Sequence, residues 1–487
     1  MKKALIALII VVLLYPLVAW LMGFAIENRV ESLTDQGQQV IPQLHLLQKS
    51  KRAGFTSDAD SSYELGPTLK LTRHYHRGWY TSVDDTDVEM SSAMLNSLSA
   101  LGPAAATAAN AEPLTSPIRY SLHTVIHHGP FCGLTCFALA RADTHVTFTD
   151  TLRDSLTKLF GNKNPITIVS RFAFSGGGST TISSPSFDHA KTDHDTFLSW
   201  GGIEATFHYG ARQEWYDLTA SAPALNVQGP KGTIEAEAMS LDMRAKRVVH
   251  TLYASDSHMK LKHFAATDAD KVKQLSIDDV VFTSQDQVQD RFMNVNYQWS
   301  AGAIQSRSMT LSSAHADFTW KHLGLDALES FSVAMRSSYQ QQNQLHAPAA
   351  QAQDMLAALK QPLTALLLEE PEMDVDRLSM AAAQGQATMT GAIHLAGFSA
   401  SDLDAPMLLI PKLDVRLDTE IDESFLASLP GVGADALTKL QPMIDQGFVT
   451  RANGTLRTQL LFQRGQLTFN GKPFSPGGMT PGKGGGH

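Results

Sequence analysis

Cysteine is nearly absent from this chain of 487 residues, which contains only two. Cys132 and Cys136 lie four positions apart, so they are too few for a disulfide scaffold or a four-thiolate zinc site. A C-x-x-C pair is also lacking, which excludes the common redox motif. In an oxidising compartment the two thiols could close one small disulfide loop, and the sequence leaves open whether they do.

Positive charge and catalytic motifs are scarce as well. The chain has 39 Lys and Arg against 48 Asp and Glu, a net charge of −9, and its only basic clusters are Lys2-Lys3 and the short stretch from Lys49 to Arg52. This excludes an extended nucleic-acid surface. No G-x-S-x-G, H-E-x-x-H or Ser-x-x-Lys context typical of a hydrolase is present. We therefore expect a protein that is not an enzyme and that needs no cofactor.

One long apolar run is present, from Ala4 to Ile26, directly after Lys2 and Lys3. A helix of about 23 residues is long enough to cross a hydrocarbon core of about 30 Å. A cleaved signal peptide is the alternative, but it would have a shorter apolar core and a small-x-small cleavage site, whereas Val18 to Met22 offers bulky residues and the apolar run continues past them. We predict a single-pass membrane anchor over residues 4–26, with a cytoplasmic N-terminus and everything from Glu27 onward on the far side.

Alternating apolar and polar residues predict many antiparallel strands after the anchor. The clearest run is Lys412–Ile421, in which Leu413 and every second residue after it would face one way. Helical spacing predicts a membrane-proximal helix over 27–52 and helices inserted near residues 150, 350 and 435. The predicted fold class is α+β, a β-rich ectodomain with inserted helices.

The predicted segments are 1–26 (cytoplasmic lysines and anchor), 27–52 (membrane-proximal helix), 53–145 (N-terminal β region with an Ala-rich insert), 146–320 (central antiparallel β region), 321–370 (helical insertion), 371–474 (C-terminal β region with a helix) and 475–487 (disordered tail).

Three short motifs stand in order along the chain: Tyr75 to Gly78, His128 to Phe131, and the closing stretch Phe462 to Gly471. With the anchor, these motifs resemble the bacterial YdgA-like family. The resemblance extends from Lys2 to about Phe474. It implies a single-span inner-membrane protein with a β-rich periplasmic body and no established activity. We expect the motif residues to be structural. They are Tyr75, His76, Arg77 and Gly78; His128, Gly129, Pro130 and Phe131; and Gly465, Asn470 and Gly471.

Histidines offer the only hint of a metal site. His74 and His76 would share one face of a strand, and His127 and His128 could approach them across a sheet. No carboxylate or thiol spacing supports such a site, and chance pairs are expected among 18 histidines. We expect no metal, and we expect Arg77, His127 and His128 instead to satisfy backbone carbonyls where strands end.

Two other motifs are weaker still. The Gly-rich segment 174–179 lacks the lysine and the following helix of a phosphate loop, so it predicts a hairpin tip. Asp84 to Asp87 lacks the glycine and glutamate of a calcium loop and predicts a solvated strand end.

The pattern as a whole favours a non-enzymatic protein of the bacterial inner membrane and periplasm. Its amphipathic sheet would bind a lipid or an extended segment of another envelope protein. A homo-oligomeric scaffold is the alternative, and a metal-assisted envelope enzyme centred on the histidines is a third hypothesis. The expected membrane contact is residues 4–26.

Overall fold

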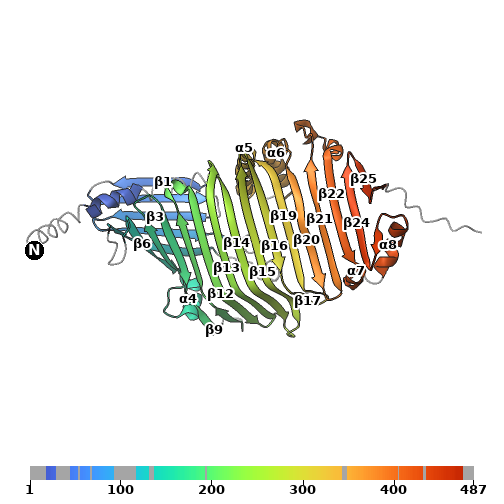
Figure 1. The fold of residues 1–487 in the computed structure, drawn as a ribbon. Helices are drawn as coiled ribbons and strands as arrows, with labels where there is room; N and C mark the ends of the chain where they lie inside the picture. Colours follow the sequence, from blue (N-terminus) through green and yellow to red (C-terminus); the bar gives the residue numbers. More distant parts are fainter. Residues whose placement is uncertain are drawn as a thin grey trace, which may run out of the picture. The chain divides into compact units, whose positions relative to one another are not determined.

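The computed structural model describes residues 18–28, 44–52, 55–65, 69–92, 117–130, 137–191, 195–342, 348–403, 405–431 and 435–474. The chain is mostly β, with antiparallel strands and few helices (Figure 1). It divides into two compact units, unit 1 (Met1–Pro223) and unit 2 (Ala224–His487). The boundary falls inside strand β12 (Trp215–Gly229).

Unit 1 is built from consecutive antiparallel hairpins. Strands β1 to β8 pair in chain order, and β8 then pairs with β11, which pairs with β12. Strands β9 and β10 form a separate pair in the β8–β11 connection. The strands are β1 (Leu44–Arg52), β2 (Ser57–Leu65), β3 (Leu69–Arg77), β4 (Thr81–Met90), β5 (Ile118–His128), β6 (Ala140–Phe148), β7 (Thr167–Phe172), β8 (Gly178–Ser184), β9 (Phe187–Lys191), β10 (Phe197–Trp200) and β11 (Ile203–Tyr209).

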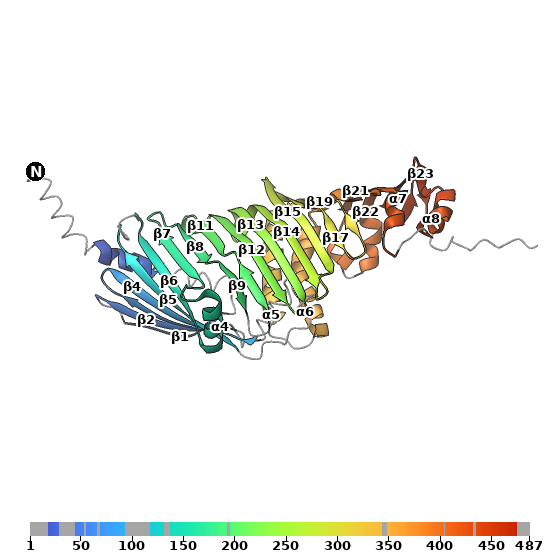
Figure 2. The ribbon, with the colours of Figure 1, turned by 90° about the horizontal axis from the view of Figure 1, so that it is seen from below.

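Five of the connections in unit 1 lie at the same end of its sheet, which we call end A. The register shows this directly, because Arg52 faces Asp58, Arg77 faces Ser82 and Tyr209 faces Tyr216. The described residues of end A are 55–56, 78–80, 129–130, 137–139, 173–177 and 210–214. The opposite end carries the longer connections, including helix α4 (Asp150–Phe160). Figure 2 shows α4 beside β9. Phe160 of α4 packs on Phe187 of β9, with ring centroids 4.8 Å apart.

A helix over residues 18–28 lies against the apolar face of this sheet at end A. Ile26 is fully buried and packs with Tyr75, Ile126, Ala140 and Ala142 on three strands. The helix coincides with the end of the apolar run that we predict as a membrane span. Among the residues that the structure describes, no helix is long and apolar enough to cross a membrane, and residues 1–17 are not among them.

Unit 2 continues the same hairpin pattern with longer strands. Pairing runs β13–β14–β15–β16–β19–β20–β21–β22–β24–β25–β26, with β17 beside β15 and β23 beside β24. The strands are β13 (Gly232–Val249), β14 (Leu252–Asp268), β15 (Lys273–Gln289), β16 (Phe292–Ala301), β17 (Ile304–Ser306), β18 (Thr310–Leu311), β19 (Ser313–Gly324), β20 (Glu372–Ala382), β21 (Gly385–Leu395), β22 (Leu413–Asp422), β23 (Thr450–Ala452), β24 (Thr455–Gln463), β25 (Gln466–Phe469) and β26 (Lys472–Pro473).

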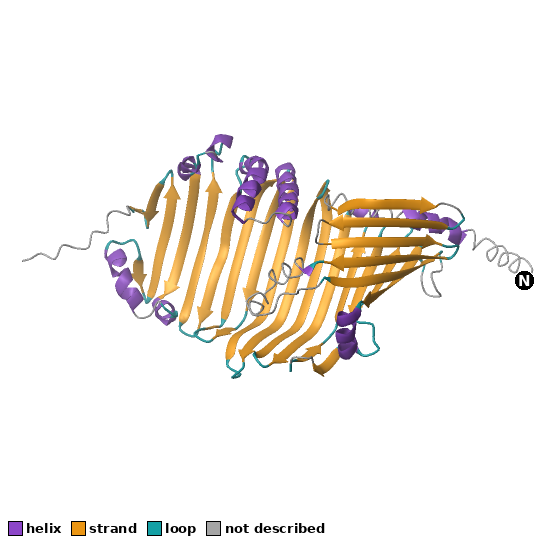
Figure 3. Cartoon of the chain, turned by 180° about the vertical axis from the view of Figure 1, so that it is seen from behind, coloured by secondary structure: helices purple, strands orange, loops and turns teal. Residues whose placement is uncertain are grey.

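The helices of unit 2 are insertions between strands. They are α5 (Leu325–Gln342), α6 (Pro348–Leu367), α7 (Glu423–Ser428) and α8 (Asp435–Asp445). Figure 3 shows the paired helices α5 and α6 against one end of the strands, and the described helices leave most of each strand uncovered.

Several predictions are confirmed. Helices occur near residues 150, 350 and 435, and the run from Lys412 forms β22. The β24–β25 hairpin turns at Arg464-Gly465, where both residues have positive φ as a tight two-residue turn requires.

Two predictions need correction. The antiparallel β-rich body is confirmed, but the α+β class overstates the helices, because they are few insertions in a mostly β chain. The membrane-proximal helix over 27–52 is also wrong for Leu44–Arg52, which forms β1. Its apolar spacing fits a helix only loosely, and pairing along the whole of β2 outweighs that local preference.

Candidate functional site

A buried ion pair joins the N-terminal helix to the sheet at end A. Arg77, at the end of β3, is fully buried, and its Nε donates to Glu27 Oε2 at 2.7 Å. Ser57 Oγ, at the start of β2, donates to the other Glu27 oxygen at 3.0 Å, and Lys51 Nζ lies 2.9 Å from it. The guanidinium also lies 3.6 Å from the centre of the Phe24 ring. Three strands, β1, β2 and β3, therefore each bring one side chain to the Glu27 carboxylate of the helix.

A second chain of hydrogen bonds lies beside this pair. Tyr75 OH donates to Ser82 Oγ at 2.9 Å, and Ser82 Oγ lies 2.8 Å from His128 Nε2. His128 Nδ1 is buried and has no hydrogen-bond partner among the described residues. It faces Gly23, where a Cβ would come within 2.9 Å of the imidazole ring. Only glycine lets the helix approach this closely.

Burial and hydrogen bonding shift the titration of these groups in different directions. Burial raises the pKa of Glu27, but hydrogen bonds from Lys51, Ser57 and Arg77 outweigh it and leave the pKa below its usual value. Burial lowers the pKa of His128 to about 4 and raises the pKa of Tyr75 to about 12. At neutral pH the network thus holds a charged carboxylate, a neutral imidazole and a neutral phenol.

The sequence motifs identify only part of this network. Tyr75, Arg77 and His128 are motif residues that the structure brings together. Arg77 does contact one backbone carbonyl, that of Phe55 at 3.3 Å, but its main partner is Glu27. In the sequence, Glu27 stands out only as the first charged residue after the apolar run. Ser57 and Ser82 carry no sequence signal, because isolated serines in strands are ordinary.

The four histidines considered as metal ligands do not come together. His74 and His76 lie on the polar face of β3, each with its own partner, at 2.9 Å from Asp60 and 2.6 Å from Asp58. His127 and His128 are neighbours in a strand, so they point to opposite faces. Within the described ranges no group of three or more His, Cys, Asp or Glu side chains is arranged to hold a metal ion.

The remaining motif residues occupy turns. Gly78 donates its N–H to the Thr81 carbonyl at 2.9 Å, and Gly129 has a φ of 108°. Asn470 and Gly471 form the β25–β26 turn. The Asn470 side chain accepts a hydrogen bond from Gln459 N at Oδ1 and donates one from Nδ2 to Phe448 O, both at 2.9 Å. His76 is exposed, and Pro130 is half-buried. Phe131, Cys132 and Cys136 lie outside the described residues, as do the tail from residue 475 and most of the Ala-rich insert.

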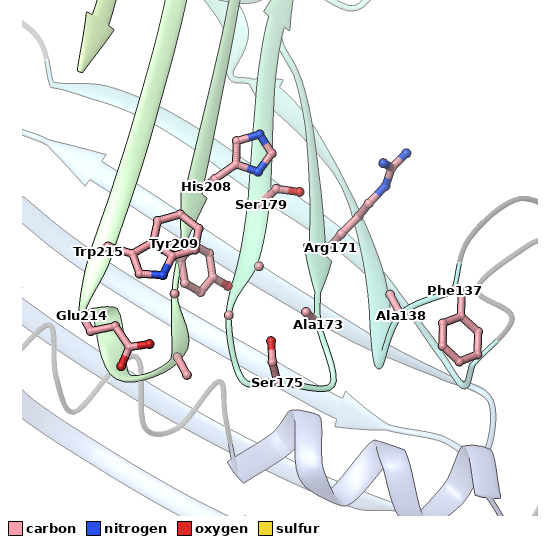
Figure 4. Close-up of a pocket in the computed structure, with 14 residues that line it drawn as sticks. Phe137, Ala138, Arg171, Ala173, Ser175, Ser179, His208, Tyr209, Glu214 and Trp215 are labelled. Atoms are coloured by element: carbon pink, nitrogen blue, oxygen red, sulfur yellow. The ribbon is translucent and has the colours of Figure 1, made fainter. Parts of the chain in front are cut away.

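The Gly-rich segment forms the β7–β8 hairpin tip, as predicted, and borders an open hollow of about 590 Å³ (Figure 4). Arg171, Ser179 and His208 are cross-strand neighbours on its lining, so they share a face. Both basic side chains are exposed. This arrangement offers positive charge and a hydroxyl at end A, but no buried polar group that would enclose a ligand.

Unit 2 presents a broad apolar surface, which we call the apolar face. One row of directly opposed residues crosses seven strands from β13 to β21, and opposed residues share a face. A second row lies two positions along the strands. The first row is Leu241, Met259, Phe282, Trp299, Ala316, Leu378 and Met389, and the second includes Tyr297, Phe318, Val375, Leu417 and Leu460.

Helices cover this face only in part. Val295 and Met293 are buried in a cluster with Leu323 and Leu325 of the α5 region, to which Leu366 of α6 contributes. Further along the strands, Met259 is 42% exposed and Tyr297 39%. The reverse face is polar, as shown by the Asn296–Thr319 hydrogen bond of 2.9 Å. The sequence predicts the alternation in β16, but not in β14, where apolar residues are sparse.

Comparison with known proteins identifies a family but no activity. The family described as "Bacterial protein of unknown function (DUF945)" matches residues 1–477. No curated protein matches the chain, and no solved structure does. The match covers nearly the whole chain and shows a bacterial family of unknown function. The name YdgA-like remains a resemblance.

Replacing Arg77 should strongly destabilise unit 1. Arg77→Met leaves the Glu27 carboxylate buried without its main partner, and we expect a loss of about 3 kcal/mol in the free energy of unfolding. Urea unfolding of the full-length protein measures it. The double variant with Glu27→Gln should recover part of the loss. Arg119→Met, which breaks an exposed pair with Glu89, should have no measurable effect. Equal losses in both single arginine variants would contradict the buried-pair interpretation.

Acid should destabilise the protein through His128. Its native pKa of about 4 lies below the unfolded value, so the unfolded state binds a proton that the native state excludes as pH falls from about 6.5 to 4. Stability is full above this window and should fall by about 3 kcal/mol across it.

His128→Gln should remove this component of the pH dependence, measured as unfolding free energies at pH 7 and pH 4.5. His76→Gln, which changes an exposed histidine on the other face, should leave it in place. The interpretation is wrong if His128→Gln keeps the same dependence of unfolding free energy on pH as the wild type.

Proposed function

The chain belongs to the DUF945 family of bacterial proteins of unknown function, and we propose that it is a non-enzymatic envelope protein that binds lipid acyl chains. The binding surface is the apolar face of unit 2. The observation that carries the proposal is that this face remains largely uncovered by the described helices, with Met259, Tyr297, Trp320 and Met380 each at least 39% exposed. Soluble proteins rarely leave so continuous an apolar surface without a ligand or partner.

An acyl chain fits the chemistry of this face better than an extended peptide. Peptides that add to a sheet bind at an edge, where backbone N–H and C=O groups are available for hydrogen bonds. The face itself offers side chains only, and its two rows are dominated by Leu, Met, Phe, Trp and Tyr. An acyl chain has no hydrogen-bonding groups, so it loses nothing by binding there.

Methionine gives the face an adaptable surface. Met259, Met380 and Met389 lie on it, and Met293 lies beneath α5 and α6. Unbranched thioether side chains can repack around ligands of different shape, which suits a surface that receives flexible chains. The Phe282 and Tyr297 rings, with centroids 6.2 Å apart, add a flat contact area beside them.

In this proposal, the apolar run near the N-terminus determines where in the cell the protein lies. The apolar run Ala4–Ile26 anchors the protein in the inner membrane by a single pass, with Lys2 and Lys3 in the cytoplasm. The body from Glu27 onward lies in the periplasm. A protein anchored there has membrane lipid as its nearest source of acyl chains.

Charge on the apolar face should abolish lipid binding. We expect the double variant Met259→Glu/Tyr297→Glu to bind about tenfold less lipid, because each carboxylate must be desolvated against an acyl chain. The measurement is native mass spectrometry of full-length protein extracted gently from its membrane, with organic extraction and quantification of the lipid that accompanies it.

Gln298→Glu is the matched control. Gln298 is exposed and adjacent to Tyr297, but its side chain points to the polar face, so the same charge there should leave bound lipid unchanged. Absence of stoichiometric lipid from the wild-type protein would refute the proposal. A second copy or a foreign chain in its place would favour a scaffold.

A further inference from the structure

End A of unit 1 carries an exposed aromatic side chain at every one of its five connections. Phe55 lies in the first, Trp79 and Tyr80 in the second, Phe137 in the third and Phe174 in the fourth. Trp215 follows the fifth directly, as the first residue of β12. They are between 40% and 76% exposed. We call this set the aromatic tips.

The aromatic tips gather into clusters, and one cluster includes the N-terminal helix. The Phe55 and Trp79 rings stack at 6.0 Å, and both lie about as close to Trp20 of the helix, at 5.9 and 6.2 Å. Phe137 and Phe174 pack at 5.3 Å. Figure 4 shows Phe137, Ser175 and Glu214 at the same strand ends. Trp20 therefore links the end of the apolar run to the aromatic tips.

The opposite end of the same sheet differs. None of the described residues in its connections is a large exposed hydrophobic side chain. Its helix α4 instead carries the exposed charges of Arg153 and Asp154. Among the described connections, exposed aromatic side chains therefore gather at end A.

The length of the apolar run places end A at the membrane. A helix over residues 4–17 would be about 21 Å long, too short for a hydrocarbon core of about 30 Å. A spanning helix must therefore include residues from Val18 onward, and one of these, Trp20, contacts Phe55 and Trp79 of the aromatic tips. Any bilayer that contains the span also reaches the depth of Trp20.

We propose that the aromatic tips insert into the outer interface of the bilayer that holds the anchor. Trp, Tyr and Phe favour this layer, where a ring can lie among acyl chains while its polar edge reaches water. Exposed Arg52, Arg171 and Arg212 lie at the same strand ends, within reach of lipid phosphates. Two exposed acidic residues, Asp58 and Glu214, lie there as well. The partner is thus a phospholipid surface. This inference rests on the anchor of the proposed function, but not on lipid binding by unit 2.

Quenching of tryptophan fluorescence by brominated lipids tests the insertion. The full-length protein carries Trp299→Phe and Trp320→Phe, so that lipid on the apolar face contributes nothing and four of its six tryptophans remain. It is reconstituted in nanodiscs of phosphatidylcholine and phosphatidylglycerol, brominated near the top of the acyl chains. With Trp20, Trp79 and Trp215 in the interface, about three quarters of the emission should be quenched.

Removing the two tip tryptophans gives opposite results under the two alternatives. With Trp79→Phe and Trp215→Phe added, the quenched fraction should fall to about one half if the tips are inserted. If only Trp20 meets lipid, the fraction should instead rise from about one quarter to about one half, which would overturn the inference. A fraction near zero in both proteins would overturn the anchor as well. Each single variant is measured alongside, so that one poorly folding protein does not decide the result.

Trp200→Phe is the matched control. Trp200 lies in β10, at the opposite end of the sheet, with its indole N–H donating to Ser184 at 3.3 Å. Its removal should raise the quenched fraction from about three quarters to nearly all of the emission. A quenched fraction that falls on this substitution would place lipid at the wrong end of the sheet and contradict the proposal.

Discussion

Side-chain alternation along antiparallel strands is the constraint on which both units depend. Because directly opposed residues share a face and consecutive hairpins return to the same end, a simple meander creates two faces and two ends from a linear sequence. In unit 1 this brings Arg77, Ser82 and Ile126 into one row, although they are up to 49 positions apart. In unit 2 it aligns Met259, Phe282 and Trp299. Both candidate surfaces follow from register alone.

A single apolar face leaves an energetic problem that the described helices solve only locally. An antiparallel sheet can leave one face in water when the other is packed. In unit 2, α5 and α6 bury Met293 and Val295, but Tyr297, two residues further along the same strand, is 39% exposed. Burial of apolar area contributes about 25 cal/mol per Å², so a ligand that covers the remainder gains free energy without displacing protein. The proposed acyl chain is such a ligand.

The sequence predicts this fold well where periodicity is strong. The run of β22 and the turn at Arg464-Gly465 follow from alternation and from the turn chemistry of glycine. Leu44–Arg52 is mistaken for helix because its apolar residues fit both periods, and only pairing with Ser57–Leu65 distinguishes them.

The candidate sites were predictable to a smaller extent. Tyr75, Arg77 and His128 stand out as motif residues, yet nothing in the sequence shows that Glu27 completes their network, because the contact joins residues 50 positions apart. The sequence does not predict the aromatic tips for a similar reason. Aromatic residues at five separate connections form no pattern until the strand register brings these connections to one end.

The buried Arg77–Glu27 pair is best understood as a device that fixes position. Replacing a buried ion pair by apolar residues is often neutral for stability, so strength alone does not explain it. Helix 18–28 is the end of an apolar run, and an apolar surface packs almost equally well on lipid tails and on a protein face. Such a helix could slide along its axis at little cost, by 1.5 Å for each residue. Glu27 prevents this, because a shift of one turn would separate its carboxylate from Arg77, Ser57 and Lys51 and leave charges buried without partners. The ion pair thereby sets the level at which Trp20 meets the aromatic tips.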